Sequence, residues 1–377
     1  MELRTASHAG KVYLRLNELW LSREKAALAL ILETKGSVPQ VAGASALITA
    51  NGLDSGTIGG GSFEAELIKR SQELLKTGQA ELITWSFSAE VGEAGSLCGG
   101  EALVLIDGSP EKTRLPLEEV ARCWRERRQG GLITLIKPSG GKVVQVERFF
   151  QAAAPPEEEI KKQEEKEGAK RLTAAPLRAV GPPFSPPDLR LLLPGERPSL
   201  RKEATPEGEI YYLFTEPILP PPRLLVFGAG HVGQAVARLG IFLGFEVFLF
   251  DDRADLSLPG DLSSRVNLVV ADMAKSLAEW PTDNFSYLVI VTRAHMHDAE
   301  VLRVALKKKA AYIGMIGSRR KAALMKQEFL NQRWASEADW QRVHTPIGLP
   351  ILAETVEEIA VSIMAEIIAV RRKKEKA

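Results

Sequence analysis

The stretch LLVFGAGHVG, just past the middle of this 377-residue chain, constrains the fold more than any other feature of the sequence. Its apolar run is typical of a buried strand, and Gly228, Gly230 and Gly233 then follow in a GxGxxG spacing that leads into a helix-like segment. In such a unit the first glycine permits a tight turn, the second leaves room for a pyrophosphate, and the third lets the helix pack on the strand. A tight turn kept only for packing is the alternative interpretation.

The segment 223–377 continues by alternating apolar strands such as FEVFLFDDR and YLVIVTR with helical stretches. This pattern predicts a Rossmann-like α/β domain whose parallel sheet is covered on both faces. Asp251 and Asp252 end its second strand, where a carboxylate would accept hydrogen bonds from a ribose. Ser318 and Arg319 follow a later glycine turn and begin a helix, where amides and a cation suit an anion.

Three histidines lie at the same predicted edge of the sheet. His231 follows the second glycine, and His295 follows the strand YLVIVTR, so we expect both near a bound cofactor. We expect His295 in a loop and the next helix to begin at His297 and Asp298. A metal pair of His295 and His297 would need a third ligand that the sequence does not supply, so we assign no metal site.

The first part of the chain, 1–150, predicts a separate amino-terminal α/β domain. Its loop GTIGGGS places Gly59, Gly60 and Gly61 ahead of an amphipathic helix, and Ser62 is the expected N-cap. Unencumbered amides before a helix suit an anion, which makes these four residues candidate cofactor ligands. A turn that needs glycine for steric reasons is an equally good interpretation.

The two cysteines lie in different contexts. Cys98 in LCGG is flanked by glycines, which would leave its sulfur approachable, and it is our candidate catalytic residue, although a small buried cysteine remains the alternative. Cys123 lies in a helix-like segment and is expected to be structural. Their spacing argues against a disulfide framework and a zinc knuckle.

A change of composition separates the two halves. The segment 151–208 is rich in Pro, Glu and Lys and has little apolar periodicity, so we expect a flexible or partly helical insertion. Residues 209–222 then read as a returning strand and a stiff linker into the second domain, which begins at 223.

The charge balance excludes several classes of protein. With 49 Lys and Arg against 48 Asp and Glu, the net charge of +1 gives no field for attracting nucleic acid or an acidic membrane. Charged residues interrupt every apolar run before it reaches membrane length. We therefore expect a cytoplasmic protein with neither kind of partner.

The combination of motifs resembles the XdhC/CoxI family of xanthine dehydrogenase accessory proteins. The motifs are GSVPQVAGASALI, GTIGGGSFEAEL and CGG in one half, with LLVFGAGHVGQAVARLG, VTRAHMHD, AYIGMIGSRRK and TPIGL in the other. The resemblance covers nearly all the chain except about 111–208. One departure is Gln40 after Pro39, where the family often has Arg, so a charge-assisted phosphate contact is absent here.

The resemblance implies a chaperone rather than an enzyme. Such a protein binds the molybdenum cofactor (molybdopterin), supports replacement of an oxo ligand by sulfur, and delivers the cofactor to a xanthine dehydrogenase or related molybdenum hydroxylase. A cysteine desulfurase is the candidate sulfur donor, and we expect a homo-oligomer. We expect residues 59–62 and Cys98 to form one wall of an interdomain cleft, and residues 228–233 with His295 the other.

Two alternatives belong to other classes. An NAD(P)-dependent oxidoreductase would use the first half as its substrate domain and Asp251 as a ribose ligand, although Arg253 blurs the choice between NAD and NADP. A docking module with vestigial pockets is the other alternative.

Overall fold

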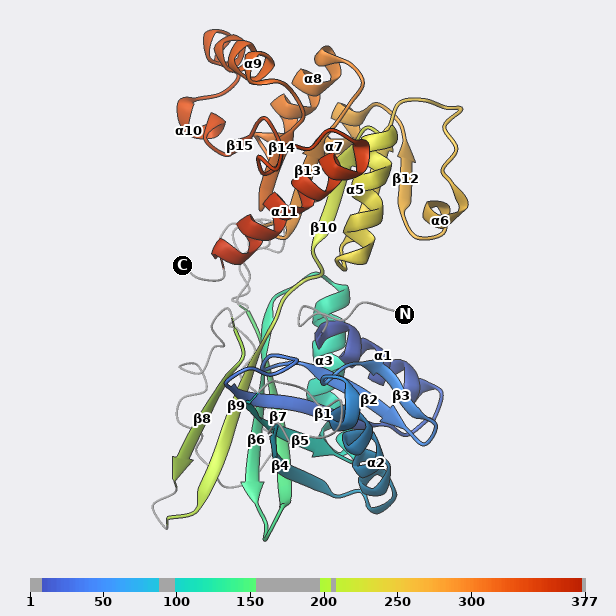
Figure 1. The fold of residues 1–377 in the computed structure, drawn as a ribbon, viewed down its shortest axis with the longest axis vertical. Coiled ribbons are helices and arrows are strands. Elements are labelled where there is room, and N and C mark those ends of the chain that lie inside the picture. The colour runs from blue at the N-terminus through green and yellow to red at the C-terminus, as the bar shows by residue number, and fades with distance from the viewer. Residues whose placement is uncertain (1–8, 88–98, 154–196, 205–207, 375–377) are drawn as a thin grey trace, which may run out of the picture. The chain divides into compact units, whose positions relative to one another are not determined.

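The computed structural model describes residues 9–87, 99–153, 197–204 and 208–374. The chain divides into two compact units, Glu2–Pro220 and Pro221–Ala377, which are described separately below. Figure 1 shows the elements of each unit along the chain.

A nine-stranded antiparallel sheet is the basis of the amino-terminal unit, in the order β3-β2-β1-β5-β4-β7-β6-β9-β8. Its strands are β1 (Ala27–Lys35), β2 (Ser45–Thr49), β3 (Gly52–Gly56), β4 (Ala80–Ser86), β5 (Glu101–Asp107), β6 (Gly130–Pro138), β7 (Val143–Ala152), β8 (Ser199–Ala204) and β9 (Ile210–Ile218). The apolar run of β1 is continuous, and because successive side chains point to opposite faces, it buries side chains on both faces of the sheet.

Helices cover both faces of this sheet. Helix α2 (Gly61–Thr77) packs on one face through Phe63 and Leu67. Helices α1 (Ala9–Leu21) and α3 (Arg114–Arg125) pack on the other, and a short 3-10 helix (Pro110–Thr113) precedes α3. The expected α/β character of the amino-terminal half is thus confirmed.

Two expectations for this unit are wrong. Ser62 is not the N-cap of α2, because Gly60 occupies that position in extended conformation and no side chain caps the helix. The second concerns only the described ends of the segment 151–208, where β7 extends to Ala152 and residues 199–204 form β8. This edge strand pairs with β9, and the pairing supplies the backbone partners that local composition could not reveal. The rest of that segment lies largely outside the described residues.

A six-stranded parallel sheet organises the carboxy-terminal unit, in the order β12-β11-β10-β13-β14-β15. Its strands are β10 (Arg223–Phe227), β11 (Glu246–Asp251), β12 (Asn267–Val270), β13 (Ser286–Ile290), β14 (Tyr312–Met315) and β15 (Val343–His344). The predicted Rossmann-like domain is confirmed.

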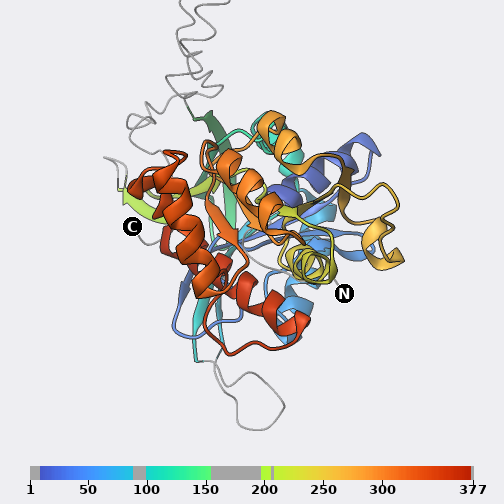
Figure 2. The same cartoon turned by 90° about the horizontal axis from the view of Figure 1, so that it is seen from above.

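Helices again cover both faces, as Figures 1 and 2 show. One face carries α5 (His231–Phe242), α6 (Gly260–Ser263) and α11 (Val356–Lys374). The other carries α7 (Met273–Glu279), α8 (His295–Ala305), α9 (Arg319–Asn331) and α10 (Glu337–Trp340). Across the described ranges, every helix is too short or too polar to cross a bilayer.

Hydrogen bonds fix helix α11 at two points. At its start, the backbone N–H of Glu358 donates to Thr355 Oγ1 at 3.2 Å and Glu358 Oε2 accepts from the Thr355 N–H at 3.1 Å, which is a capping box. Further along, the Glu366 carboxylate accepts from the hydroxyl of Tyr312 and the N–H of Gly348. The contacts of Glu366 fix which face of α11 points inward.

A buried polar network links α1 to the sheet of the amino-terminal unit. The Tyr13 hydroxyl donates to Glu216 Oε2 at 2.9 Å, and both side chains are almost completely buried. Nearby, Arg148 Nη1 donates to Asp107 Oδ2 and Thr113 Oγ1, each at 2.7 Å. Burial raises the pKa of Glu216 to about 7, although Tyr13 and Arg148 partly oppose the shift.

This raised pKa predicts a specific pH dependence of stability. The folded state binds the proton of Glu216 more tightly than the unfolded chain, so the stabilisation is complete below about pH 4.5 and is lost as the pH rises through about 7. Glu216→Gln keeps an acceptor for Tyr13 but removes the titration. In urea unfolding, the free energy of unfolding of the parent should fall relative to that of the variant by up to about 1.4 kcal/mol per pH unit across that window. Parallel pH profiles of the two proteins would contradict this assignment.

Candidate functional site

The predicted site lies where the parallel sheet reverses its strand order. From β10 the chain adds β11 and β12 on one side, whereas β13, β14 and β15 extend the sheet on the other. The carboxyl ends of β10 and β13 therefore flank a topological switch point, which is where open α/β sheets bind ligands. The glycine loop follows β10, and residues 292–294 follow β13.

Two of the three glycines are required by the backbone itself. Gly228 has a φ of 107°, and a Cβ there would lie 2.4 Å from the carbonyl oxygen of Val291. A Cβ on Gly233 would lie 1.9 Å from the carbonyl oxygen of Gly228. The first glycine thus permits the turn against β13, and the third permits α5 to pack on the turn.

Gly230 is different, because it is not needed for the fold of the loop. It is the N-cap of α5 with a φ of −74°, and no described atom lies within 4 Å of a Cβ placed on it. Its neighbour His231 is exposed and begins the helix. The backbone at the start of α5 is therefore open, and the first amides of a helix have no partner within the helix.

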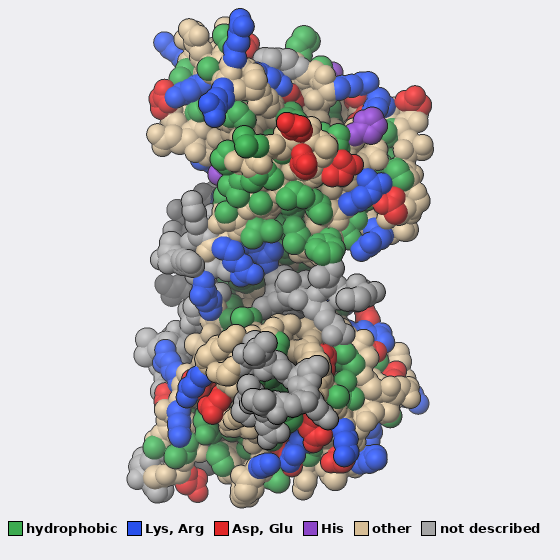
Figure 3. Space-filling model, in the orientation of Figure 1, with side chains coloured by type: hydrophobic (Ala, Val, Ile, Leu, Met, Phe, Trp, Pro, Cys, Tyr) green, Lys and Arg blue, Asp and Glu red, His purple; other side chains and the backbone are tan. Residues whose placement is uncertain are grey.

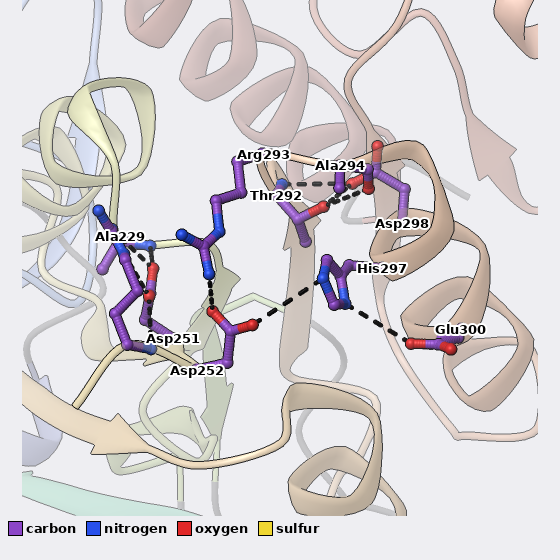
Figure 4. Close-up of polar contacts among 10 residues, drawn as sticks. Ala229, Asp251, Asp252, Thr292, Arg293, Ala294, His297, Asp298 and Glu300 are labelled. Carbon is purple, nitrogen blue, oxygen red and sulfur yellow. Dashed lines mark hydrogen bonds and ion pairs between the residues drawn. The ribbon is translucent and has the colours of Figure 1, made fainter.

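A buried carboxylate at the end of β11 fixes this loop. Asp251 Oδ2 accepts from the Ala229 N–H at 2.8 Å and from Arg253 Nη2 at 3.0 Å, while Oδ1 accepts from Arg253 Nε at 2.8 Å and the Arg253 N–H at 3.1 Å. Figure 4 shows Asp251 directed at Ala229. Burial alone would raise the pKa of Asp251, but these hydrogen bonds outweigh it and hold the pKa below its ordinary value.

Asp251 is therefore a positioning residue for the loop. Its two oxygens already accept four hydrogen bonds, so the carboxylate has no capacity left for a ribose hydroxyl. The sequence analysis did not predict this role, because no sequence pattern shows that the guanidinium of Arg253 folds back onto Asp251, two residues earlier. The same contact holds Arg253, whose side chain is 33% exposed, beside the loop.

The second carboxylate of the pair faces one residue that follows β13 and one from α8. Asp252 Oδ1 accepts from Arg293 Nη2 at 2.9 Å, and its Oδ2 lies 3.9 Å from His297 Nε2 (Figure 4). His297 Nδ1 lies 3.6 Å from Glu300 Oε2. In the described part of the chain, no group of three His, Cys, Asp or Glu side chains is placed to hold a metal ion.

Helix α8 begins earlier than expected. His295 is its first residue and Ala294 its N-cap, so the predicted loop position of His295 is wrong, and the helix does not begin at His297. His295 and His297 therefore do not share a face, because residues two apart in a helix point to different sides. The buried Asp298 accounts for the early start, because its Oδ1 accepts from the Thr292 hydroxyl at 2.6 Å and from the Thr292 N–H at 3.2 Å.

Helix α9 adds a cation to the same edge. Ser318 caps it by accepting from the Lys321 N–H at 3.2 Å, and Arg319 is its exposed first residue, as the sequence predicts. The Lys321 ammonium donates to Asp298 Oδ2, so this lysine ties α9 to α8. The sequence pattern does not show that Lys321 has the buried Asp298 as its partner.

The glycine motifs of the amino-terminal unit meet at one end of its sheet. A Cβ on Gly36, which has a φ of 69°, would lie 2.8 Å from the carbonyl oxygen of Gly99. A Cβ on Gly100 would lie 2.4 Å from the carbonyl oxygen of Ser37. The turn after β1 thus packs against the glycines that follow Cys98, while Cys98 itself lies outside the described residues.

The third glycine motif of this unit lies beside the first. A Cβ on Gly59 would lie 3.8 Å from Pro39 Cβ, which places the loop before α2 near the GSVPQ turn. Gly60 and Gly61 are exposed and open, and Ser62 is an exposed residue of the first turn. The carboxyl group of Glu64 is buried at the same loop, 3.3 Å from Thr57 Oγ1.

The contrast between Gly230 and Gly233 predicts opposite effects of one substitution. Gly233→Ala should lower the free energy of unfolding by more than ~2 kcal/mol, because its Cβ collides with the backbone of the loop. Gly230→Ala meets open space and should cost less than ~1 kcal/mol. Urea unfolding of both variants measures the difference, and equal losses would show that the loop is not built as described.

Comparison with known proteins finds relatives along the whole chain. A protein of Bacillus subtilis, described as a probable subunit of xanthine dehydrogenase, is 25% identical over 367 residues, which cover 97% of this chain and 98% of that protein. The molybdenum cofactor insertion chaperone PaoD of Escherichia coli is 24% identical over 152 residues, which cover 40% and 41%. A crystal structure described as a xanthine dehydrogenase from Bacillus halodurans shares the fold, with a TM-score of 0.68 at 22% identity over 96% of each chain.

Sequence profiles of known families match both halves. Residues 224–367 match the XdhC Rossmann domain, and this range contains the glycine loop and Asp251. Residues 19–86 match the XdhC and CoxI family and contain the GSVPQ turn and the loop before α2. The chain therefore belongs to the XdhC/CoxI family and carries an XdhC Rossmann domain in its carboxy-terminal unit.

Proposed function

We propose that this protein binds the molybdenum cofactor, assists its sulfuration and delivers it to a xanthine dehydrogenase or a related molybdenum hydroxylase. Membership of the XdhC/CoxI family and similarity to the molybdenum cofactor insertion chaperone PaoD support this assignment. A cytoplasmic location and a cysteine desulfurase as sulfur donor belong to the same proposal. The protein acts as a carrier in this account rather than as an enzyme.

The observation that carries the proposal is the open backbone at Gly230 in a loop that is otherwise rigidly fixed. The molybdenum cofactor bears a phosphate, and amides at the start of a helix suit such a group. A Cβ would fill this space, so glycine leaves room that the fold itself does not require. Arg253 and Arg293, each oriented by an aspartate that balances its charge, place guanidinium N–H groups near the loop.

The amino-terminal unit carries a second candidate binding surface of its own. Gly36 and Gly100 pack closely, so the chain that follows Cys98 is held at the end of β1 and β5. A thiolate at Cys98 would be a soft ligand suited to molybdenum. The cofactor, once delivered, supplies the metal centre of the hydroxylase, whereas this chain's residues bind and orient it.

The environment of Asp251 counts against the oxidoreductase alternative. A dinucleotide in the usual Rossmann mode places a ribose against the carboxylate that ends the second strand. Here the oxygens of that carboxylate already accept hydrogen bonds from Ala229 and Arg253. A ligand that uses the glycine loop for its phosphate and does not need a ribose acceptor fits these contacts better.

Gly230→Val tests the glycine loop directly. The branched side chain would occupy the space proposed for the phosphate, so the affinity for anaerobically prepared molybdopterin should fall by roughly tenfold or more, about 1.4 kcal/mol. Gly260→Val is the matched control, because a Cβ there also meets no described atom within 4 Å and the residue lies in α6. Equal affinities of parent, Gly230→Val and Gly260→Val would remove the loop from the binding site.

Cys98→Ser tests the proposed role of sulfur. Serine is nearly isosteric but a poor soft ligand, so the variant should stay folded yet fail to activate an apo molybdenum hydroxylase with sulfurated cofactor. Cys123→Ser is the control, because Cys123 is buried in α3 and burial raises the pKa of its thiol to about 11. Activation per folded molecule is the measurement, and full activation by Cys98→Ser would exclude Cys98 from cofactor handling.

A further inference from the structure

The amino-terminal unit buries polar side chains that its own hydrogen bonds do not fully satisfy. On the face that Figure 3 draws, charged side chains of this unit spread over the outer surface, whereas Arg148 and Glu216 are only 4% and 1% exposed. Several buried side-chain atoms have no hydrogen-bond partner in the described part of the chain, among them Arg148 Nε and Nη2, Glu216 Oε1, Thr134 Oγ1 and Asn17 Oδ1. Native proteins hold few such atoms, because burial without a partner costs free energy.

Three of these side chains occupy neighbouring positions on one face of the sheet. Thr134 on β6 lies directly opposite Arg148 on β7. Glu216 on β9 lies opposite Leu132 on β6, and Leu132 is two residues before Thr134 and therefore on the same face. Directly opposite and diagonal neighbours in a sheet lie roughly 5 and 8 Å apart, so Thr134 is a neighbour of both ionisable side chains.

Helix α1 covers the same place. Tyr13 packs in one apolar cluster with Leu132, and its hydroxyl donates to Glu216 Oε2 at 2.9 Å. Asn17 is four residues after Tyr13, on the same side of the helix, and it is buried. The amide oxygen of Asn17 therefore belongs to the same group of buried atoms.

Arg148 presents one edge of its guanidinium to this place. Its Nη1 donates to Asp107 Oδ2 and Thr113 Oγ1, each at 2.7 Å, which leaves Nε and Nη2 without a partner. These two nitrogens form a fork that can donate to two oxygens. Burial raises the pKa of Glu216 to about 7 and the charge of Arg148 opposes this shift, yet no hydrogen bond joins these two described side chains.

The charges around these atoms favour water as the ligand. Asp107 already balances the charge of Arg148, so an anion bound at the fork would add an unbalanced negative charge to the interior. A cation would lie against the guanidinium. Water accepts from Arg148 and donates to the oxygens of Glu216 and Asn17, and a buried water molecule makes about three hydrogen bonds.

We propose that the amino-terminal unit binds a cluster of buried water molecules that joins the guanidinium edge of Arg148 to Thr134 Oγ1 and Glu216 Oε1. Because Tyr13 and Asn17 belong to α1, the cluster ties this helix to β6, β7 and β9. The site lies in the interior of one unit and is independent of the cofactor chemistry proposed above.

Thr134→Val tests whether the Thr134 hydroxyl has a partner. Valine has nearly the same shape, so in urea unfolding of the full chain the midpoint for this unit should fall, because the water molecules lose one hydrogen bond. Thr215→Val is the matched control, since the Thr215 hydroxyl lies 2.8 Å from Ser199 Oγ and its removal breaks a known hydrogen bond. Loss of a hydroxyl without a partner has the opposite effect, so a midpoint of Thr134→Val at or above that of the parent would overturn the proposal.

A crystal structure of the full chain locates the water molecules directly. One or more ordered water molecules should connect Arg148 Nη2 to Glu216 Oε1 through hydrogen bonds of ~2.7–3.2 Å. A direct hydrogen bond between these two side chains, or no ordered water beside Arg148 where other buried water is visible, would overturn the proposal. An anomalous peak at the Arg148 guanidinium after a bromide soak would also overturn it, because the place would then bind an anion.

Discussion

The carboxylate of Asp251 is the contact on which the carboxy-terminal site depends. It accepts hydrogen bonds from the amide of Ala229 in the glycine loop and from the guanidinium of Arg253. The N–H of Ala229 therefore has a buried acceptor within the protein itself. The same carboxylate orients the guanidinium of Arg253 beside the loop, while the backbone at Gly230 stays open.

Much of this architecture was predictable from local patterns. Alternating strands and helices with a GxGxxG turn are sufficient to predict a parallel sheet and its ligand edge, because chain direction and handedness restrict the topology. The steric requirements of Gly228 and Gly233 were also predicted correctly. The capping box of Thr355 and Glu358 is likewise a local pattern, since both partners lie within one turn.

The predictions that failed depend on hydrogen-bond partners that a local sequence pattern does not show. Some partners lie far apart in the chain, and others are neighbours that compete with a ligand for the same acceptor. Asp251 looked available to a ribose because the sequence does not show that Arg253 folds back onto it. His295 joined α8 because the buried Asp298 fixes the helix start to Thr292. Residues 199–204 became a strand because β9 supplies the missing hydrogen bonds, although the composition around them is typical of a flexible segment.

The central claim is that this chain carries the molybdenum cofactor on its glycine loops. The most direct test is to purify the full chain anaerobically from cells that make the cofactor and to identify the small molecule that remains bound. The account predicts molybdopterin, detected as its fluorescent oxidation product, at about one molecule per chain. A bound nicotinamide dinucleotide, or no pterin under conditions in which a known carrier retains it, would contradict the account.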